Sequence, residues 1–197
     1  MFLFKLEHLN PDNAVDVDGA KSSAKHLSAK RGWAPVGENA CKFTFFICGK
    51  HLTSMCAFTP RGFTKWSIYE GNLNNRHIID FFRTELSPSL TADSFVILDN
   101  WSGHHHPDAI SAIDEVTKGR WKFSAQYAYN TKPVERGISM VKAWVRNYDA
   151  AAAIDPISVL NAAFYYYSPQ GPGGVVAHGL WRQYYDNHNA YLHARNV

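Results

Sequence analysis

The chain has 197 residues and a formal net charge of +3 at pH 7, and apolar residues make up 46% of it. This composition is typical of one globular domain of ordinary size and excludes an intrinsically disordered chain. No apolar run reaches the roughly 18 residues that a membrane-spanning helix needs, so we expect no membrane partner. The mild positive charge permits a polyanionic partner without requiring one.

Cysteine usage indicates the compartment. Cys41, Cys48 and Cys56 are odd in number and lack the paired spacing of a zinc site, which argues against a disulfide framework. The opening MFLFKLEHLN is too short, and too soon interrupted by charge, for a secretory signal. A reducing compartment, cytosol or nucleus, is therefore expected.

The first half of the chain alternates β-prone runs with a loop and a helix. Residues 13–19, NAVDVDG, predict a short strand that closes on Asp18. The basic run 21–31 has no apolar periodicity and predicts an exposed loop. Residues 42–59 contain two β-rich arms around Gly49 and Lys50, which predicts a hairpin. Residues 74–86 repeat apolar residues at a helical period.

The middle of the chain continues with a strand, a helix and another strand. The unbroken apolar run 95–98 predicts a strand covered on both faces. Pro107 can begin a helix, whose apolar stripe is Ile110, Ile113 and Val116 or Thr117. Residues 121–127, WKFSAQY, predict a second short strand.

Two further helices are expected before an irregular tail. One carries the stripe Val134, Ile138, Val141, Val145 and Tyr148.

The other begins at Asp155 as N-cap with Pro156 in its first turn, and the Pro- and Gly-rich tail after Ser168 is expected to be irregular. The order of elements favours a single α/β domain with a mixed sheet over residues 1–197. We expect its core at about residues 13–150 and a C-terminal helix and tail at residues 151–197.

Three acids stand where a metal site is expected. Asp18 and Asp99 each follow a predicted strand, and ligands gather where neighbouring strands of an open α/β sheet end. Glu135 lies in the first turn of the long helix. Together they form an oxygen-ligand set suited to Mg²⁺ or Mn²⁺, and two such ions can activate a water or 3′-hydroxyl and stabilise the leaving oxygen of a phosphodiester.

Three blocks of the sequence resemble the DDE endonuclease domain of the mariner/Tc-type transposases, particularly their fungal relatives. The segment VDVDGAKSSAKHLSAKRGWAPVGE resembles the family's strand-end Asp followed by a Gly-Trp-x-x-x-Gly element, with Trp33 placed 15 residues after Asp18. FVILDNWSGHHH resembles its apolar strand, Leu-Asp-Asn and a His five residues beyond the Asp. YAYNTKPVERGISMVKAWVR resembles its Tyr-Ser-Pro-x-x-Asn-Pro-x-Glu, and 35 residues separate Asp99 from Glu135.

The resemblance implies an RNase H-like fold, a mixed sheet with flanking helices, and a nuclear enzyme that cleaves DNA and transfers strands with two Mg²⁺ or Mn²⁺ ions. It implies that Asp18, Asp99 and Glu135 bind the metals, and that His104 has a structural or phosphate-facing role. Asn100 and Trp33 are expected to support the site. DNA is the implied partner, and a homodimer is compatible with the need for two active sites acting together.

The chain also departs from the family pattern. Gly19 stands where the family usually has Glu, and Lys132 stands where Asn normally precedes the Pro before the last acid. Lys132 is expected either to contact substrate phosphate or to pair with a carboxylate and weaken metal binding. The sequence begins only a dozen residues before the first strand, and we expect no helix-turn-helix region before it. These departures favour, as an alternative, a degenerate or domesticated transposase remnant that binds nucleic acid or protein without catalysis. An RNase H-like nuclease acting on RNA is a weaker alternative.

Several residues allow two interpretations. Asp16 competes with Asp18 as first ligand, because alternation places both on one face of the strand, and the Trp33 interval favours Asp18. His104, His105 and His106 are either a zinc site or, more simply, a loop of partly exposed histidines.

Basic residues are candidates for DNA contact or belong to ordinary solvated surfaces. These are Lys30 and Arg31 in the basic loop, and Lys142 and Arg146, which lie along one side of the long helix with Glu135.

Overall fold

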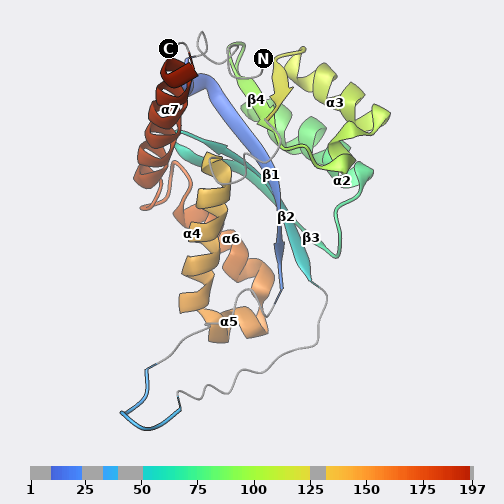
Figure 1. The fold of residues 1–197 in the computed structure, drawn as a ribbon. Coiled ribbons are helices and arrows are strands. Elements are labelled where there is room, and N and C mark those ends of the chain that lie inside the picture. The colour runs from blue at the N-terminus through green and yellow to red at the C-terminus, as the bar shows by residue number, and fades with distance from the viewer. Residues whose placement is uncertain (1–9, 24–32, 40–50, 125–131, 196–197) are drawn as a thin grey trace.

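A five-stranded mixed sheet forms the centre of the molecule, with strand order β3-β2-β1-β4-β5 (Figure 1). In this computed structural model the described residues are 10–23, 33–39, 51–124 and 132–195. The strands are β1 (Ala14–Ser22), β2 (Leu52–Thr59), β3 (Gly62–Glu70), β4 (Phe95–Leu98) and β5 (Trp121–Phe123). β1, β2 and β3 pair antiparallel, whereas β4 pairs parallel with both β1 and β5.

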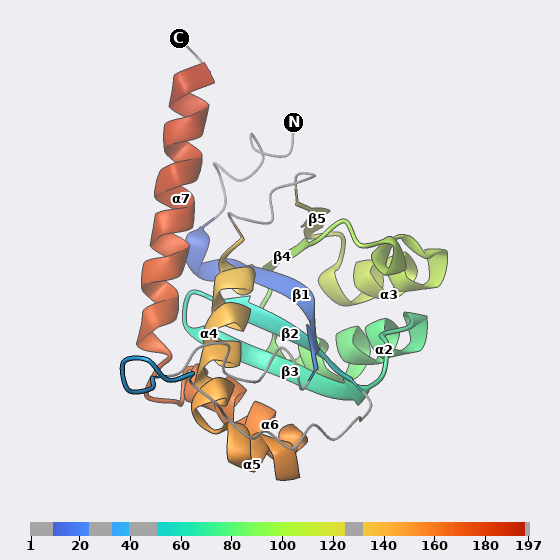
Figure 2. The same cartoon turned by 60° about the horizontal axis from the view of Figure 1, so that its bottom comes forward.

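The helices cover both faces of this sheet. They are α2 (Asn75–Asp80), which continues as a π-helical turn at Phe81–Leu86, α3 (Pro107–Thr117), α4 (Pro133–Asn147), α5 (Asp149–Ile154), α6 (Pro156–Tyr166) and α7 (Val175–Arg195). Figures 1 and 2 show α2 and α3 on one side of the sheet and α4, α5, α6 and α7 on the other. The fold is therefore a layered α/β arrangement, as the order of elements predicted.

The two faces of the sheet carry separate hydrophobic cores. On the α2 and α3 side, Val15 and Val17 of β1 pack with Val96 and Leu98 of β4. On the α4 side, Ala14 and Ala20 of β1 pack with residues of α4, α6 and α7. Because side chains alternate along a strand, Asp16 and Asp18 belong to the same face as Ala14 and Ala20. The two aspartates therefore face α4, and the predicted alternation is confirmed.

Most predicted helices and strands are present. The apolar run 95–98 is β4, and its last three residues are buried. In α4 the stripe Val134, Ile138, Val141 and Val145 is buried, whereas Tyr148 at its end is half exposed.

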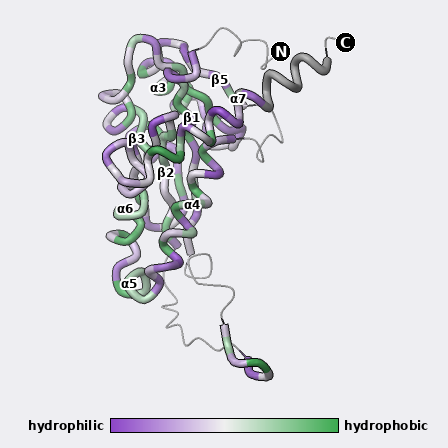
Figure 3. The backbone as a smooth tube through the Cα atoms, turned by 90° about the vertical axis from the view of Figure 1, so that its left-hand side faces the viewer, coloured by the Kyte–Doolittle hydropathy of each residue, from purple (hydrophilic) through white to green (hydrophobic). Residues whose placement is uncertain are grey.

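Asp155 caps α6 as predicted, because its carboxylate accepts a hydrogen bond from the Ser158 N–H at 3.1 Å. Figure 3 shows hydrophobic residues concentrated along the central strands, in agreement with these buried stripes.

The observed hairpin joins β2 to β3 through Pro60 and Arg61, and β3 was not predicted. Gly62 has a φ of 117°, which only glycine adopts readily, and a Cβ there would lie 2.3 Å from the Tyr167 carbonyl oxygen. The first arm and the turn of the hairpin predicted around Gly49 and Lys50 lie outside the described residues. Only its second arm, residues 52–59, is seen, and it is β2.

Two segments predicted to be irregular contain regular structure: the residues just after Asp18 and the tail after Ser168. β1 does not close on Asp18 but continues to Ser22, because β2 remains paired with it over residues 18–22. Lys21 and Ser22 therefore belong to a strand, and the remainder of the predicted basic loop lies largely outside the described residues.

The predicted irregular tail contains α7, which buries Ala177 and Trp181 against the core. No helix in the described part of the chain has both the length and the hydropathy needed to cross a membrane. The division into a core at about 13–150 and a C-terminal part stays a prediction.

Candidate metal centre

Asp18 and Asp99 lie on neighbouring parallel strands. Val17 of β1 is paired with Leu98 of β4, so the next residue on each strand is an aspartate. β4 ends there, whereas β1 continues beside β2. Asp18 thus lies at the edge where the parallel ladder ends, although it is inside a strand. In open α/β sheets this carboxyl end of the parallel strands is where ligands bind.

The third acid approaches from the helix layer. Glu135 lies in the first turn of α4, whose Gly137 lies so close to the sheet that an added Cβ would be 2.9 Å from Phe63 Cζ. The absence of a side chain at Gly137 therefore allows α4 to pack down and bring its first turn toward β1.

The three carboxylates interact electrostatically. Burial raises the pKa of Asp18, and the charge of Asp99 raises it further. Burial also raises the pKa of Glu135. The negative charges of Asp18 and Asp99 raise it further. Yet within the residues that the structure describes, no three His, Cys, Asp or Glu side chains are gathered closely enough to hold a metal ion. The fold brings the predicted acids to one region without closing them into a ligand cluster.

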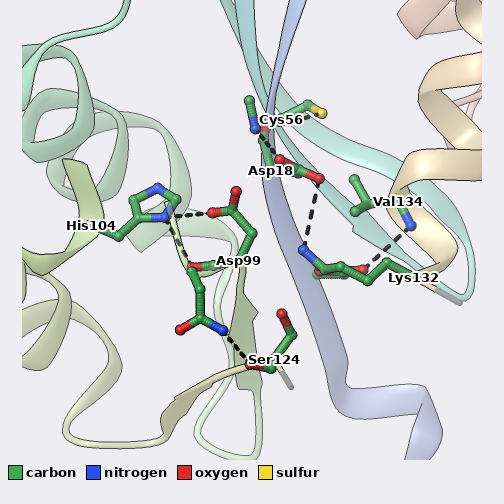
Figure 4. Close-up of polar contacts among 10 residues, drawn as sticks. Asp18, Cys56, Asp99, His104, Ser124, Lys132 and Val134 are labelled. Carbon is green, nitrogen blue, oxygen red and sulfur yellow. Dashed lines mark hydrogen bonds and ion pairs between the residues drawn. The ribbon is translucent and has the colours of Figure 1, made fainter. Parts of the chain in front are cut away.

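Asp99 is held by His104, as Figure 4 shows. His104 is 2% exposed, and its Nδ1 lies 2.7 Å from Asp99 Oδ1. Burial by itself would raise the pKa of Asp99, but the hydrogen bond and charge of His104, together with Lys132, bring it below its ordinary value. The structural role expected for His104 is thus the orientation of Asp99.

Asn100, the residue after Asp99, connects the ends of β4 and β5. Its Nδ2 donates a hydrogen bond of 2.6 Å to the carbonyl oxygen of Ser124 (Figure 4). This contact ties the segment after β4 to the segment after β5 and fixes the backbone next to Asp99.

A buried lysine occupies the other side of the acids. Lys132 precedes α4 and is 3% exposed, and its Nζ lies 3.3 Å from Asp16 Oδ1 and 3.7 Å from Asp18 Oδ2 (Figure 4). Burial would lower the pKa of Lys132, but the charges of Asp16, Asp18 and Asp99 raise it above its ordinary value. Lys132 was expected either to contact substrate phosphate or to pair with a carboxylate. In the structure it pairs with the carboxylates of Asp16 and Asp18.

Asp16 and Asp18 have different surroundings. Asp16 is 1% exposed, and its Oδ2 accepts a hydrogen bond of 3.4 Å from the Val134 N–H at the start of α4. Burial raises the pKa of Asp16 to about 7, against the opposing effect of Lys132. Asp18 and Asp99 follow directly on the paired residues Val17 and Leu98, and the charge of Asp99 raises the pKa of Asp18. These surroundings favour Asp18 as the ligand and Asp16 as the buried partner of Lys132, although the choice stays a prediction.

The three consecutive histidines point to different partners. His104 contacts Asp99, and the ring of His105 stacks on Phe123 with centroids 4.2 Å apart. His106 caps α3 by accepting a hydrogen bond from the Asp108 N–H. They do not converge as a zinc site would require.

The remaining predicted site residues are less closely connected. Lys142 is half buried on α4, and burial and the neighbouring Arg146 lower its pKa, so these two cations lie near each other. Trp33 is fully exposed and lies on a segment drawn away from the sheet and helices, so its expected support of the site is not seen (Figure 1). Lys30 and Arg31 lie outside the described residues.

Two neighbours of the acids were missed by sequence reasoning. The thiol of Cys56 on β2 is 3.6 Å from the Asp18 carbonyl oxygen, and burial raises its pKa well above the ordinary value. Tyr184 of α7 has its pKa raised to about 12 by burial and by the charge of Asp16. The sequence identified Cys56 only as one of three cysteines without paired spacing, and Tyr184 belongs to a helix that was not predicted.

Comparison with known proteins identifies the family. A family model described as DDE superfamily endonuclease matches residues 15–156, well over half of the chain, and the match includes all three acids. No curated protein matches the sequence.

Solved structures of the mariner transposase Mos1 share the fold. The pre-cleavage Mos1 transpososome has a TM-score of 0.59 at 11% identity, and covers 95% of this chain and 59% of its own. The Mos1 strand transfer complex has a TM-score of 0.62 at 12% identity, covering 93% of this chain and 56% of its own. The structure of the Mos1 transposase catalytic domain and raltegravir with Mg has a TM-score of 0.54 at 12% identity. The match covers 94% of this chain and 89% of the Mos1 chain.

At these identities the likeness shows the RNase H-like fold alone. The chain spans less than two thirds of the length of the first two Mos1 chains. The narrower resemblance to fungal members stays a prediction. The family match over residues 15–156 shows that this chain belongs to the DDE superfamily endonucleases.

Proposed function

We propose that this chain is the catalytic domain of a transposase that cleaves DNA phosphodiesters and transfers strands with divalent metal ions, acting in the nucleus. The observation that supports the proposal is that β1, the end of β4 and the first turn of α4 carry Asp18, Asp99 and Glu135 to one region of the fold, where Asp18 and Asp99 raise the pKa of Glu135. Asp99 raises the pKa of Asp18, and both raise the pKa of Glu135, and a shared cation would stabilise such neighbouring negative charges.

The residues present fit Mg²⁺ or Mn²⁺ in their chemistry. Asp18, Asp99 and Glu135 supply hard oxygen ligands, and Asp99 has its pKa lowered, so it is ionised at neutral pH. Because the three side chains do not form a closed cluster, phosphate oxygens of DNA would complete the coordination. The bound metal would stabilise the charge that develops on the attacking and leaving oxygens.

The other side chains orient the ligands and attract the substrate. His104 fixes the direction of the Asp99 carboxylate, and Asn100 fixes the backbone beside it. Lys142 and Arg146 place two positive charges on the helix that carries Glu135, which supports contact with a DNA backbone along α4. A homodimer is part of this proposal, because coupled cleavage of two DNA ends needs two active sites.

The proposed activity is tested with Asp99→Asn in a plasmid-nicking assay containing Mn²⁺. The substitution keeps the size of the side chain but removes a charged ligand, so we expect nicking to fall to the level seen with EDTA. Asp93→Asn removes an exposed carboxylate before β4 and is the matched control, with nicking unchanged. Thermal melting confirms that both variants are folded. Unchanged nicking by Asp99→Asn would contradict the proposed function.

A second candidate function is a non-catalytic remnant that binds nucleic acid or protein. The pairing of Lys132 with Asp16 and Asp18 favours it, because a protein cation already neutralises part of the acidic site. DNA binding that persists in EDTA, with no nicking in Mn²⁺, would support this candidate against the first. Cleavage of an RNA–DNA hybrid in preference to duplex DNA would instead indicate an RNase.

A further inference from the structure

The position of Lys132 bears on how many metal ions the site can hold. Its side chain is 4% exposed, and the carboxylates within 4 Å are those of Asp16, 1% exposed, and Asp18, 11% exposed. In the family pattern that this chain resembles, a neutral Asn takes this place. The chain therefore carries one additional positive charge inside the acidic site.

Both oxygens of Asp18 already face positively polarised groups of the chain, one through a hydrogen bond and the other through an ion pair. Asp18 Oδ1 accepts a hydrogen bond of 2.7 Å from the Gly19 N–H, and Asp18 Oδ2 faces Lys132 Nζ at 3.7 Å. A divalent ion on this side of Asp18 would stand beside an ammonium group, and like charges at that distance repel strongly in a buried site.

Lys132 is also held in place by its second partner. Asp16 is buried against the start of α4, where its Oδ2 accepts a hydrogen bond of 3.4 Å from the Val134 N–H and its Oδ1 lies 3.3 Å from Lys132 Nζ. Leaving a buried carboxylate without its cation is costly. Lys132 itself lies at the N-cap of α4, and Pro133, the first residue of the helix, follows it. Displacement of the ammonium group by a metal ion is therefore disfavoured.

The side away from Lys132 remains suited to a metal. Asp99 is oriented by His104, and its side chain is 30% exposed. Glu135 is partly exposed in the first turn of α4. These two carboxylates are accessible to an ion that arrives with DNA, whereas the Asp16 side is closed.

We propose that Lys132 is a built-in cation that takes the place of one of the two divalent ions, so that this chain binds a single ion on the side of Asp99 and Glu135. This inference rests on the proposed function and replaces the two-ion site expected from the sequence.

The test counts Mn²⁺ ions bound per chain of 197 residues, by electron paramagnetic resonance of the free ion during titration. We expect one ion for the wild type and two for Lys132→Asn, with the affinity of the first ion raised about tenfold or more by the loss of a neighbouring positive charge. Lys118→Asn removes a lysine at the end of α3, where its left-handed backbone conformation suits Asn. This matched control should bind one ion.

A second measurement separates a metal-like role from a purely structural one. Lys132→Asn should melt at a lower temperature than the wild type in EDTA, and Mn²⁺ should restore most of the difference. A structural ion pair alone would leave the variant equally destabilised with and without Mn²⁺, which would overturn the proposal.

The outcomes also separate this inference from the proposed function. Two ions bound by the wild type, or the same number bound by wild type and Lys132→Asn, would overturn the role of Lys132 and leave the metal-dependent activity standing. No binding by either protein at millimolar Mn²⁺, with or without duplex DNA, would overturn both. A single ion in the wild type that Asp99→Asn abolishes would support both.

Discussion

Replacing Lys132 by Met isolates the effect of its charge. Met keeps an unbranched apolar stem in the buried position and removes the ammonium group that faces Asp16 and Asp18. The change therefore leaves two carboxylates in a poorly solvated site without their nearest cation. The expected cost depends on whether Asp16 is ionised.

The magnitude follows from the pKa of Asp16, which burial raises from 3.8 to about 7 in the folded chain. The folded chain therefore binds this proton more tightly than the unfolded chain does. Stability from this group is present at low pH and is lost as pH rises from about 4 to about 7. At about 1.4 kcal/mol for each pH unit, the loss in the wild type totals about 4 kcal/mol.

The positive charge of Lys132 lowers the pKa of Asp16 and so opposes the effect of burial. Removing Lys132 should therefore raise the pKa of Asp16 further. At about pH 5.5 Asp16 is largely protonated in both proteins, so Lys132→Met should reduce the free energy of unfolding by only about 1 kcal/mol. At about pH 8.5 the wild type holds an ion pair that the variant lacks. The reduction should then reach about 3–5 kcal/mol, the cost of breaking a buried pair.

Urea unfolding in EDTA at these two pH values measures both quantities. Lys122→Met, on the exposed side of β5, is the control and should change stability little at either pH. Equal losses for Lys132→Met at the two pH values, or a larger loss at the lower one, would refute the reasoning, because the cost would not then follow the ionisation of Asp16.

Two further substitutions test how the site is held. In His104→Gln the 2.7 Å contact with Asp99 is lost, so the pKa of Asp99 should rise, and the stability that this ionised carboxylate contributes above its unfolded pKa should fall by about 1–3 kcal/mol. Carboxyl ¹³C titration and urea unfolding near pH 6 measure the two effects, and an unchanged Asp99 pKa would contradict the assigned role. Gly137→Ala and Gly179→Ala make the same change in two helices. The second should stabilise the protein by about 1 kcal/mol, because a Cβ there meets nothing within 4 Å. The first should gain nothing or lose stability, because its Cβ would lie 2.9 Å from Phe63, and thermal melts that shift equally for both would refute the close packing of α4.

Local patterns were sufficient for much of the fold. Residues 95–98 are uniformly apolar because β4 is covered on both faces, and the stripe from Val134 to Val145 follows the period of the helix that it buries. The cap at Asp155 depends only on the three residues after it. The order and spacing of three sequence blocks led to the family, which the match over residues 15–156 supports.

Where the pattern was weak, pairing and packing decided the structure. β3 lacks a buried stripe, since most of its side chains are only partly covered, and it exists because β2 is beside it. β1 continues past Asp18 for the same reason. Among the described side chains of α7, Ala177 and Trp181 are buried, and the helix sequence shows no clear helical period.

For the site, the sequence by itself determined which acids are present and on which elements they lie. Only the tertiary structure decided what each acid contacts. His104 lies five residues from Asp99, but its ring reaches Asp99 because of the turn at Ser102–His105.

Lys132 is far from Asp16 in the sequence, and the two meet because the start of α4 packs over β1. Contacts between distant residues depend on packing and side-chain direction, which the composition and spacing of a single chain do not record.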